Sequence, residues 1–468
     1  MKRIFLFLII FAGVYLMAAC SDDEKFTTSA SVQLTFSVDS VKMDTVFSNV
    51  GSRTYDFWVY NRGNRGIRLQ QVHLQQGNQT GFRVNVDGAY LDNDLGSVVS
   101  NLEVRSGDSI RVFVELTAPR NQQQEPQLVE DRLIFTLENG QQQYVTLWAH
   151  SWDALLVDSL VVGRDSLIQS AIPIVVSKGL RVDSAATLTL RNTTLFFHDK
   201  AGIDVYGSLK AENAVLRGDR LDRLFSYLPY DRVSGQWRGL RIYPSSYDNE
   251  LIGTEIRNAE YGIICDSAEL RSDRQRLYME RSVVHNCAGP GLQAFNSWVG
   301  LLRCQFTNTE GDCVAIYGGA AIMDYCTLAQ FYPFTSNRGA ALRFANFYDS
   351  YSYPLQAMTM TNSIVTGYDD DVVMGQAMEG DSLTAFTYYF ENTLLRTDTV
   401  RMVDPQRPAG SNMVPDTVKF VNVRWEWKLP ADSMQGKKHF RLIDETNLIY
   451  DFHLDSLSTA KGLGCYDD

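Results

Sequence analysis

The sequence predicts an all-β protein in which a β-sandwich is followed by a solenoid of stacked coils. Three features predict it: segments that alternate apolar and polar residues before residue 150, a short phrase that recurs every 21 or 22 residues beyond it, and few stretches that favour helix. Hydrophobic residues make up 45% of the 468 and charged residues 21%, which suffices for packed cores and argues against disorder.

The first residues predict a cleaved targeting segment with a lipid attachment site. Lys2 and Arg3 precede an uncharged apolar run, residues 4–17, that is shorter than the ~20 residues of a membrane-spanning helix. The run ends in Leu-Met-Ala-Ala-Cys, which resembles a lipobox. That resemblance implies that residues 1–19 are a lipoprotein signal peptide and that Cys20 carries acyl chains such as palmitate, which would anchor the protein in a membrane.

A short acidic tether, residues 20–30, follows the lipid site. Its Ser-Asp-Asp-Glu segment, residues 21–24, is similar to the acidic signal that sends lipoproteins of Bacteroidota to the cell surface. The resemblance implies an outer-membrane protein that faces outward; a solvated tether without targeting function is the alternative. Loss of Lys2 and Arg3 with the signal changes the formal charge from −12 to −14, which disfavours nucleic acid as a partner.

Residues 31–152 are predicted to form the sandwich. Apolar and polar residues alternate, as in half-buried antiparallel strands, in residues 32–36, 55–59, 110–116 and 144–148. The turn at residues 105–109 and the strand after it resemble the late strand of immunoglobulin-like domains related to pilus chaperones. The resemblance implies an Ig-like sandwich.

Residues 153–400 are predicted to form the solenoid, with repeats that are visible from about residue 172. The recurring phrase is a turn residue, a small residue and two further residues of which the second is always apolar, and it begins at residues 192, 213, 281, 303, 325, 362 and 392. The steps of 21, 22 and 22 residues between neighbours match one coil of a parallel β-helix, and longer gaps indicate inserted loops. Trp237 to Ile242 is predicted to be a further coil strand, with Gly239 at a close-packed position.

Three asparagines, Asn258, Asn286 and Asn308, each follow the last apolar residue of a strand by two positions. They resemble the stacked asparagine ladder of right-handed parallel β-helices, in which amide side chains hydrogen-bond from coil to coil at a tight turn. Asparagine satisfies buried backbone groups and tolerates left-handed geometry. Three unrelated turn asparagines are the alternative.

The order of these features resembles that of right-handed parallel β-helix surface lipoproteins of Bacteroidota. The resemblance rests on the lipobox, the sandwich, the Gly-Gln-Trp-x-Gly-Leu strand and the closing residues 451–454. It implies a right-handed parallel β-helix, with residues 401–468 as a C-terminal cap and a monomer as the state in solution. Enzymes of this fold act on polysaccharides, but a fold by itself does not establish a function.

No catalytic residues are identified from the sequence. Gly-His-Gly, Gly-x-Ser-x-Gly and His-Glu-x-x-His motifs are all absent, and no Cys-x-x-Cys supports zinc. The only candidate for a cofactor site is Asp369-Asp370-Asp371, which either binds Ca²⁺ or forms a solvated turn. The disulfide state of the six cysteines after Cys20 stays open, and Cys304 and Cys326 are expected to be buried.

The tyrosines Tyr348, Tyr351 and Tyr353 lie between two repeats and are the candidate ligand-binding residues. Aromatic rings stack on sugars, although such a loop can also pack its rings against the solenoid wall. We therefore expect a surface lipoprotein with a non-catalytic binding face for a glycan or a protein partner. The alternative is a polysaccharide lyase or glycoside hydrolase on the same scaffold.

Overall fold

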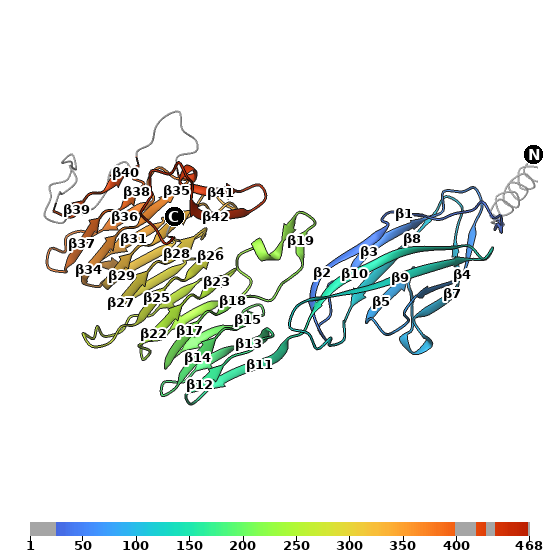
Figure 1. Cartoon of the computed structure of the whole chain (residues 1–468), viewed down its shortest axis with the longest axis horizontal. Coiled ribbons are helices and arrows are strands. Elements are labelled where there is room, and N and C mark those ends of the chain that lie inside the picture. Colours follow the sequence, from blue (N-terminus) through green and yellow to red (C-terminus); the bar gives the residue numbers. More distant parts are fainter. Residues whose placement is uncertain (1–24, 398–417, 427–435, 467–468) are drawn as a thin grey trace, which may run out of the picture. The chain divides into compact units, whose positions relative to one another are not determined.

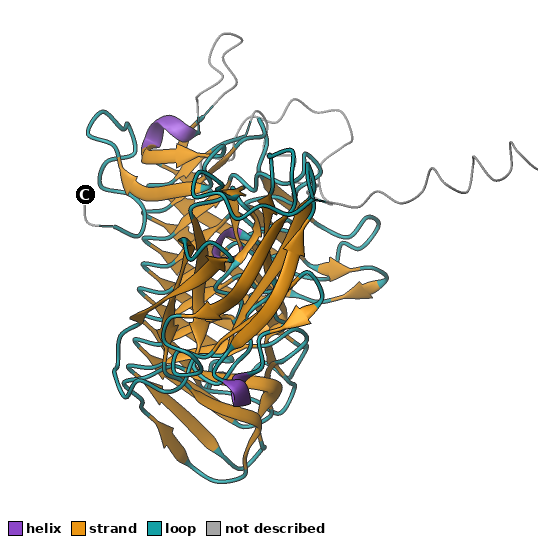
Figure 2. Cartoon of the chain, turned by 90° about the vertical axis from the view of Figure 1, so that its right-hand side faces the viewer, coloured by secondary structure: helices purple, strands orange, loops and turns teal. Residues whose placement is uncertain are grey.

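The computed structural model describes residues 25–397, 418–426 and 436–466. The predicted signal peptide and the lipid site Cys20 lie outside the described residues. The chain forms two compact units that divide between Asp153 and Ala154. Helix within the described ranges is limited to the 3-10 turns η1 (Asn93–Leu95), η2 (Tyr230–Arg232) and η3 (Lys437–His439) (Figure 2). None of these helical turns is long and apolar enough to cross a membrane.

The first unit is a sandwich of two five-stranded sheets, which confirms the predicted sandwich. One sheet has the order β1 (Thr35–Phe36), β3 (Tyr55–Tyr60), β8 (Ser109–Leu116), β5 (Phe82–Val86) and β6 (Ala89–Tyr90). The other has the order β2 (Ser40–Phe47), β10 (Gln142–Trp152), β9 (Gln127–Leu137), β4 (Ile67–Leu74) and β7 (Val98–Val104). Strand pairs are antiparallel except for β2 with β10, which are parallel.

Alternation of side chains builds the core of this unit. In β3, Phe57 and Val59 are buried while Asp56 and Trp58 are exposed. Phe82, Val112 and other residues of the remaining strands complete one continuous apolar core between the sheets.

The second unit is a parallel β-helix, whose strands form three faces that recur in the order 1, 2, 3 along the chain (Figure 1). Face 1 contains β12 (Ser166–Ile168), β14 (Thr187–Arg191), β17 (Ser208–Glu212), β22 (Asn249–Ile252), β25 (Leu277–Glu280), β34 (Leu355–Thr361), β37 (Phe386–Glu391) and β39 (Phe420–Val421). Face 2 contains β15 (Thr194–Phe197), β18 (Val215–Gly218), β23 (Glu255–Arg257), β26 (Val283–His285), β28 (Gln305–Thr307), β30 (Thr327–Gln330), β35 (Ile364–Gly367), β38 (Leu394–Leu395) and β40 (Arg424–Trp425).

Face 3 contains β16 (Gly202–Val205), β21 (Gly239–Ile242), β24 (Ile263–Cys265), β31 (Leu342–Ala345) and β36 (Val373–Gln376). Four longer strands turn a corner: β11 (Leu155–Val162) and β13 (Ile174–Val182) belong to faces 2 and 3, and β27 (Leu292–Leu302) and β29 (Val314–Asp324) to faces 3 and 1. All neighbouring strands in the three faces pair in parallel.

The register between neighbouring coils places similar side chains directly above one another. On face 2, Ile256 pairs with Val284, which pairs with Phe306, which pairs with Leu328, and all four are fully buried. The residues on either side of each point outward, because successive side chains of a strand face opposite ways. The interior is therefore one apolar column, and face 2 displays a regular outer surface.

The corner between faces 1 and 2 explains the recurring phrase. Its first residue has a left-handed backbone conformation in successive coils, with φ of 50° at Asn213, 53° at Arg303 and 48° at Asn392. The small residue that follows points inward and is buried, as at Cys304 and Cys326. Burial raises the pKa of the Cys304 thiol to about 12, so these cysteines behave as small apolar side chains.

Two loops interrupt the coils on the side of face 2. Residues 219–238 join β18 to β21 and contain the hairpin β19 (Arg223–Phe225) and β20 (Leu228–Pro229) together with η2. Residues 331–341 join β30 to β31. A further insertion, β32 (Phe347–Tyr348) and β33 (Tyr351–Ser352), follows β31 at the corner between faces 3 and 1. The long gap between the repeats at residues 325 and 362 therefore contains a coil strand as well as inserted loops.

The C-terminal part differs from the predicted division at residue 400. Strands β39 and β40 pair with β37 and β38, so the coils continue past residue 400. The antiparallel hairpin β41 (Phe440–Asp444) and β42 (Ile449–Leu454) then lies on the outer surface of face 2 (Figure 1). There Phe440 and Phe452 bury the outward residues Ala329, Ile364 and Leu394, so this hairpin covers a side wall.

A buried polar network fastens the segment before this hairpin to the last coil. His439 Nε2 lies 3.0 Å from a carboxylate oxygen of Glu426, and its Nδ1 lies 3.2 Å from the Ser458 hydroxyl. Thr366 donates a hydrogen bond to the other Glu426 oxygen, which also pairs with Arg396. Burial alone would raise the pKa of Glu426, but the bond from His439 and the charge of Arg396 outweigh burial and hold the pKa below its usual value.

We predict that Gly239→Ala severely destabilises the solenoid. A Cβ at Gly239, whose φ is 110°, would lie 1.8 Å from the carbonyl oxygen of Tyr261 in the next coil. We expect a loss of more than about 3 kcal/mol, measured by thermal or urea unfolding. Gly380→Ala is the control, because Gly380 also has a positive φ but no atom near its Cβ position, and it should lose only about 1–2 kcal/mol. Equal losses would contradict close packing at Gly239.

We predict that Glu426→Gln costs stability at neutral pH and little in acid. Because the pKa of Glu426 is lower in the folded chain, its contribution is complete above the unfolded value of about 4.5 and is lost as pH falls through the folded pKa. Unfolding at pH 7 should show a loss of about 1.5–3 kcal/mol that shrinks below pH 4. Glu212→Gln, which removes the exposed ion pair with Arg191, should cost under about 1 kcal/mol. A loss that stays constant with pH would contradict the assignment.

Candidate functional site

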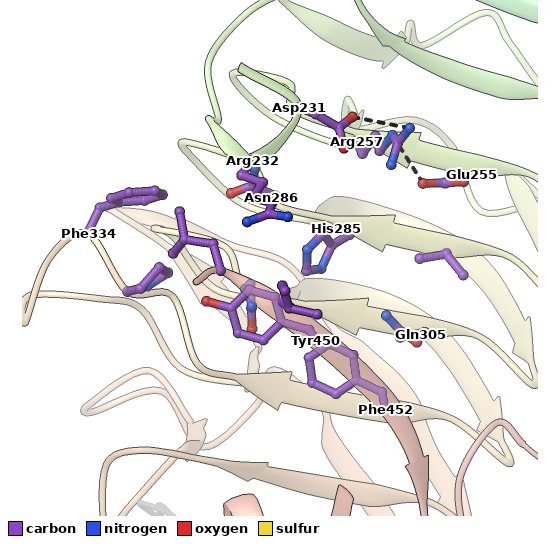
Figure 3. A pocket seen from close by; sticks show the side chains of 15 residues that line it. Asp231, Arg232, Glu255, Arg257, His285, Asn286, Gln305, Phe334, Tyr450 and Phe452 are labelled. Atoms are coloured by element: carbon purple, nitrogen blue, oxygen red, sulfur yellow. Dashed lines mark ion pairs between the residues drawn. The ribbon is translucent and has the colours of Figure 1, made fainter. Parts of the chain in front are cut away.

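The outer surface of face 2 carries a pocket of about 310 Å³ (Figure 3). Its floor is formed by the outward side chains of three neighbouring coil strands, Glu255, Arg257, Val283, His285 and Gln305. Its walls come from the two inserted loops and the C-terminal hairpin, through Asp231, Arg232, Pro333, Phe334 and residues 448–450 and 452. Asn286 and Asn308 lie at the corner where the floor ends.

Two of the predicted ladder asparagines hold the loops that wall the pocket. The Asn258 amide donates hydrogen bonds to the backbone carbonyls of Asp231 (2.9 Å) and Val233 (3.0 Å). The Asn308 side-chain oxygen accepts a bond from the backbone N–H of Phe331 (3.3 Å). Each asparagine thus fixes the base of one loop beside face 2.

The three asparagines stack in adjacent coils, as the continuing backbone bonds show, and φ is 62°, 57° and 55° at Asn258, Asn286 and Asn308. The hydrogen bonds described for their amides go to loop backbone and not to one another, which differs from the expected ladder. Amide-to-amide bonds occur at the corner between faces 1 and 2, from Asn213 to Asn192 (3.2 Å) and from Asn392 to Asn362 (2.6 Å). At the corner after face 2, where Asn258 and Asn308 lie, the inserted loops provide backbone partners for the asparagine side chains.

The charged groups of the pocket are engaged with protein partners. Arg257 pairs with Asp231 (3.3 Å) and with Glu255 (3.2 Å), and Asp231 also pairs with Arg217 (2.7 Å). Burial, with the nearby charge of Arg257, lowers the pKa of Arg217 to about 10, so it remains a cation at neutral pH. Arg232 donates to the backbone carbonyl of Asn447 and so connects the first loop to the hairpin.

His285 is a neutral ring in the pocket floor. Burial and the charge of Arg257 lower its pKa to about 4. Its Nδ1 lies 2.8 Å from the Thr307 hydroxyl, and the ring meets Tyr450 edge-on at a centroid distance of 5.7 Å. Figure 3 shows this ring close to Tyr450.

Several polar groups of the pocket have no protein partner. The Tyr450 hydroxyl and the Asn308 side-chain nitrogen are buried without a hydrogen-bond partner. The side chain of Asn286, a residue only 5% exposed, makes no hydrogen bond to the described part of the chain. Such groups are costly to bury unpaired, so their presence together in one pocket indicates a polar ligand or water.

The predicted ligand-binding tyrosines lie elsewhere, at the corner between faces 3 and 1. Tyr348 meets Phe295 (4.9 Å) and Tyr317 (4.7 Å) nearly edge-on, and Tyr353 lies 6.4 Å from Phe295. Phe295 and Tyr317 stack on each other, so most ring faces are used within the cluster. Tyr351, 66% exposed, is the residue of this set most open to solvent.

The predicted calcium residues are engaged with arginines and backbone. Asp369 pairs with Arg338 (3.3 Å) and Asp370 with Arg396 (3.5 Å), while Asp371 accepts a bond from the backbone of Val373. Among the described residues, no three His, Cys, Asp or Glu side chains are grouped to hold a metal. The geometry therefore does not favour a Ca²⁺ site at residues 369–371.

Comparison with known proteins gives weak structural likenesses. The sequence matches no family model and no curated protein. Similar solved structures include a family 123 glycoside hydrolase from Clostridium perfringens, studied for glycolipid glycan hydrolysis, at 7% identity and a TM-score of 0.19. The similar part covers 26% of this chain and 26% of the hydrolase, so the chain spans about a quarter of that enzyme.

Two further structures are similar over larger shares. The catalytic unit of an α-1,3-glucanase of family GH87 from Streptomyces thermodiastaticus is 12% identical, with a TM-score of 0.25, over 79% of this chain and 87% of that one. A PapD-like domain of human CEP192 is 13% identical, with a TM-score of 0.18, over 27% and 90%. Likenesses this weak say nothing about the chemistry of the pocket.

We predict that Asn258→Ala destabilises the protein more than Asn213→Ala. Both substitutions place alanine at a left-handed position, so the backbone cost is similar. Only Asn258 is fully buried and loses two bonds to a loop, which should add about 1–3 kcal/mol in chemical unfolding. Equal losses from the two variants would show that Asn258 does not anchor the loop.

Proposed function

We propose that the protein is a lipid-anchored, outer-membrane protein that faces the cell surface and binds a glycan without cleaving it. The Leu-Met-Ala-Ala-Cys segment ending at Cys20 and the acidic residues 21–24 support the anchor and its direction. The pocket on face 2 is the observation that supports glycan binding, because it combines aromatic rings with unpaired amide and hydroxyl groups.

The lining of the pocket favours a sugar over other ligand classes. Phe334, 46% exposed, and the ring of Tyr450 offer apolar surfaces to the flat C–H face of a sugar ring, and the buried Phe452 supports Tyr450 from beside it. Asn286 and Asn308 offer groups for hydroxyls. The acidic balance of the chain, −12 overall, opposes binding of nucleic acid.

The carboxylates of the pocket support binding rather than hydrolysis. Glycoside hydrolysis uses one carboxyl group that donates a proton and a second that acts as base or nucleophile. Asp231 and Glu255 both pair with Arg257, an arrangement that serves charge balance. The neutral ring of His285 is hydrogen-bonded to the Thr307 hydroxyl.

The sandwich fits the role of a spacer in this proposal. Along the chain it lies between the lipid site and the pocket-bearing solenoid, and its strands close over a core of their own. A folded unit of this kind can hold a binding site away from a membrane without taking part in binding.

We predict that lipid-free protein beginning at Ser21 binds neutral glycans on an array and leaves them intact, with and without Ca²⁺. Phe334→Ala should weaken that binding about tenfold, because it removes an exposed ring of the pocket. Phe225→Ala, which removes an exposed ring of the other inserted loop, outside the pocket, should bind like the unchanged protein.

Product analysis of any bound glycan separates the proposal from its alternative. Shortened products would replace it with a polysaccharide lyase or glycoside hydrolase, and unsaturated products that require Ca²⁺ would direct mutation to residues 369–371. Failure to bind any glycan would remove the proposal and leave a protein partner as the other expected ligand.

A further inference from the structure

We propose that the pocket on face 2 receives one uncharged pyranose ring, held by Asn286, Asn308 and the Tyr450 hydroxyl against the rings of the hairpin. This inference rests on the proposed function and names the sugar class that the same site takes. Neutral hexoses are the expected ligands, and uronic acids or other charged sugars are excluded.

The exclusion of charged sugars follows from the charge balance. Among the residues that line the pocket, two carboxylates, Asp231 and Glu255, face two arginines, Arg232 and Arg257. Asp231 is also paired with Arg217, which lies outside the lining. The ion pairs at 3.3 and 3.2 Å occupy Arg257, and Arg232 is bonded to the hairpin backbone. A charged ligand would lose hydration and would have to displace these protein partners to reach an arginine, which is costly in a partly enclosed site.

The unpaired groups set the hydrogen-bonding pattern. The Asn308 nitrogen is a donor, and the Tyr450 hydroxyl is both donor and acceptor. The Asn286 side chain has a nitrogen that donates and an oxygen that accepts. Asn286 and Asn308 are 5% and 1% exposed, so neighbouring residues hold them in place. Sugar hydroxyls, which donate and accept equally, can satisfy all three residues at once.

The size and the apolar lining limit the ligand to about one ring. A volume of about 310 Å³ is at the lower end of the ~300–1,000 Å³ range of ligand pockets. The rings of Tyr450 and Phe452 are nearly parallel, at 9°, and Phe334 lies on the opposite loop. Figure 3 shows Tyr450 and Phe452 extending beside His285, where a ring with one apolar face would contact them.

The pocket is also built in advance of binding. Asn258 and Asn308 fix the two loops to the solenoid corner, and Arg232 connects the first loop to the hairpin. The hairpin itself rests on face 2 through Phe440 and Phe452. Little ordering is then required of the protein, which favours binding of a small ligand.

The test is an NMR titration of lipid-free protein beginning at Ser21 with the methyl glycosides of glucose, galactose and mannose, and with methyl glucuronide and methyl galacturonide. We expect at least one neutral glycoside to bind and both acids to bind at least tenfold more weakly. Tyr450→Phe should weaken the neutral glycoside about three- to tenfold, the loss of one hydrogen bond. Preferred binding of an acid, or absence of binding by every neutral glycoside, would overturn the inference.

Stability measurements separate a binding role of the Tyr450 hydroxyl from a structural one. Because this buried hydroxyl has no partner, Tyr450→Phe should leave the melting temperature unchanged or raise it. Tyr351→Phe removes an exposed hydroxyl outside the pocket and should change neither affinity nor melting temperature. Unchanged affinity of Tyr450→Phe, or a lower melting temperature, would contradict the assignment.

The two levels of the proposal fail differently. If the array shows glycan binding but the pocket variants Tyr450→Phe and Phe334→Ala bind like the unchanged protein, the pocket assignment fails and glycan binding stands. If the unchanged protein binds no glycan on the array, the proposed function fails with it.

Discussion

Every feature of the outer wall depends on the parallel register between neighbouring coils. Pairing of Ile256 with Val284 and of Val284 with Phe306 fills the interior. The same pairing brings Arg257, His285 and Thr307 side by side on the outside, because the side chains of a strand alternate. A shift of one residue would exchange these sets, so the apolar core dictates where the polar floor of the pocket lies.

Loop insertions convert this regular wall into a pocket. A coil with short turns has no room for extra backbone, so the loops at residues 219–238 and 331–341 leave the coil beside face 2. Backbone groups of both loops then need partners, and Asn258 and Asn308 supply them. Asn286, in the coil between, has no inserted loop beside it, and it lines the pocket.

The C-terminal hairpin connects stability with the site. Its rings Phe440 and Phe452 cover apolar residues that the last coils turn outward, and the neighbouring Tyr450 forms a pocket wall. The buried contact of His439 with Glu426 holds the start of this segment. Interactions that stabilise the last coils therefore also position the pocket, although they do not touch a ligand.

Local pattern in the sequence determined much of the architecture. Alternation predicted the sandwich strands, and the 21- and 22-residue steps predicted the coils, since each coil meets the same steric demands at its corner and in its narrow interior. The turn asparagines were also recognisable, because few residues other than glycine accept left-handed geometry easily. The immunoglobulin-like topology and the lipid anchor stay predictions.

Only the tertiary structure decided where the candidate site is. More than a hundred residues separate Asp231 from Phe334, and again Phe334 from Tyr450. They line one pocket because the stacked coils bring their loops to the outer surface of face 2. Of the tyrosines predicted as ligand-binding residues, Tyr348 and Tyr353 pack on Phe295 from an earlier coil, whereas Tyr351 is exposed, and their role stays a prediction. Short-range periodicity records which way a side chain faces, whereas its neighbours across coils depend on register and loop length, which no local pattern contains.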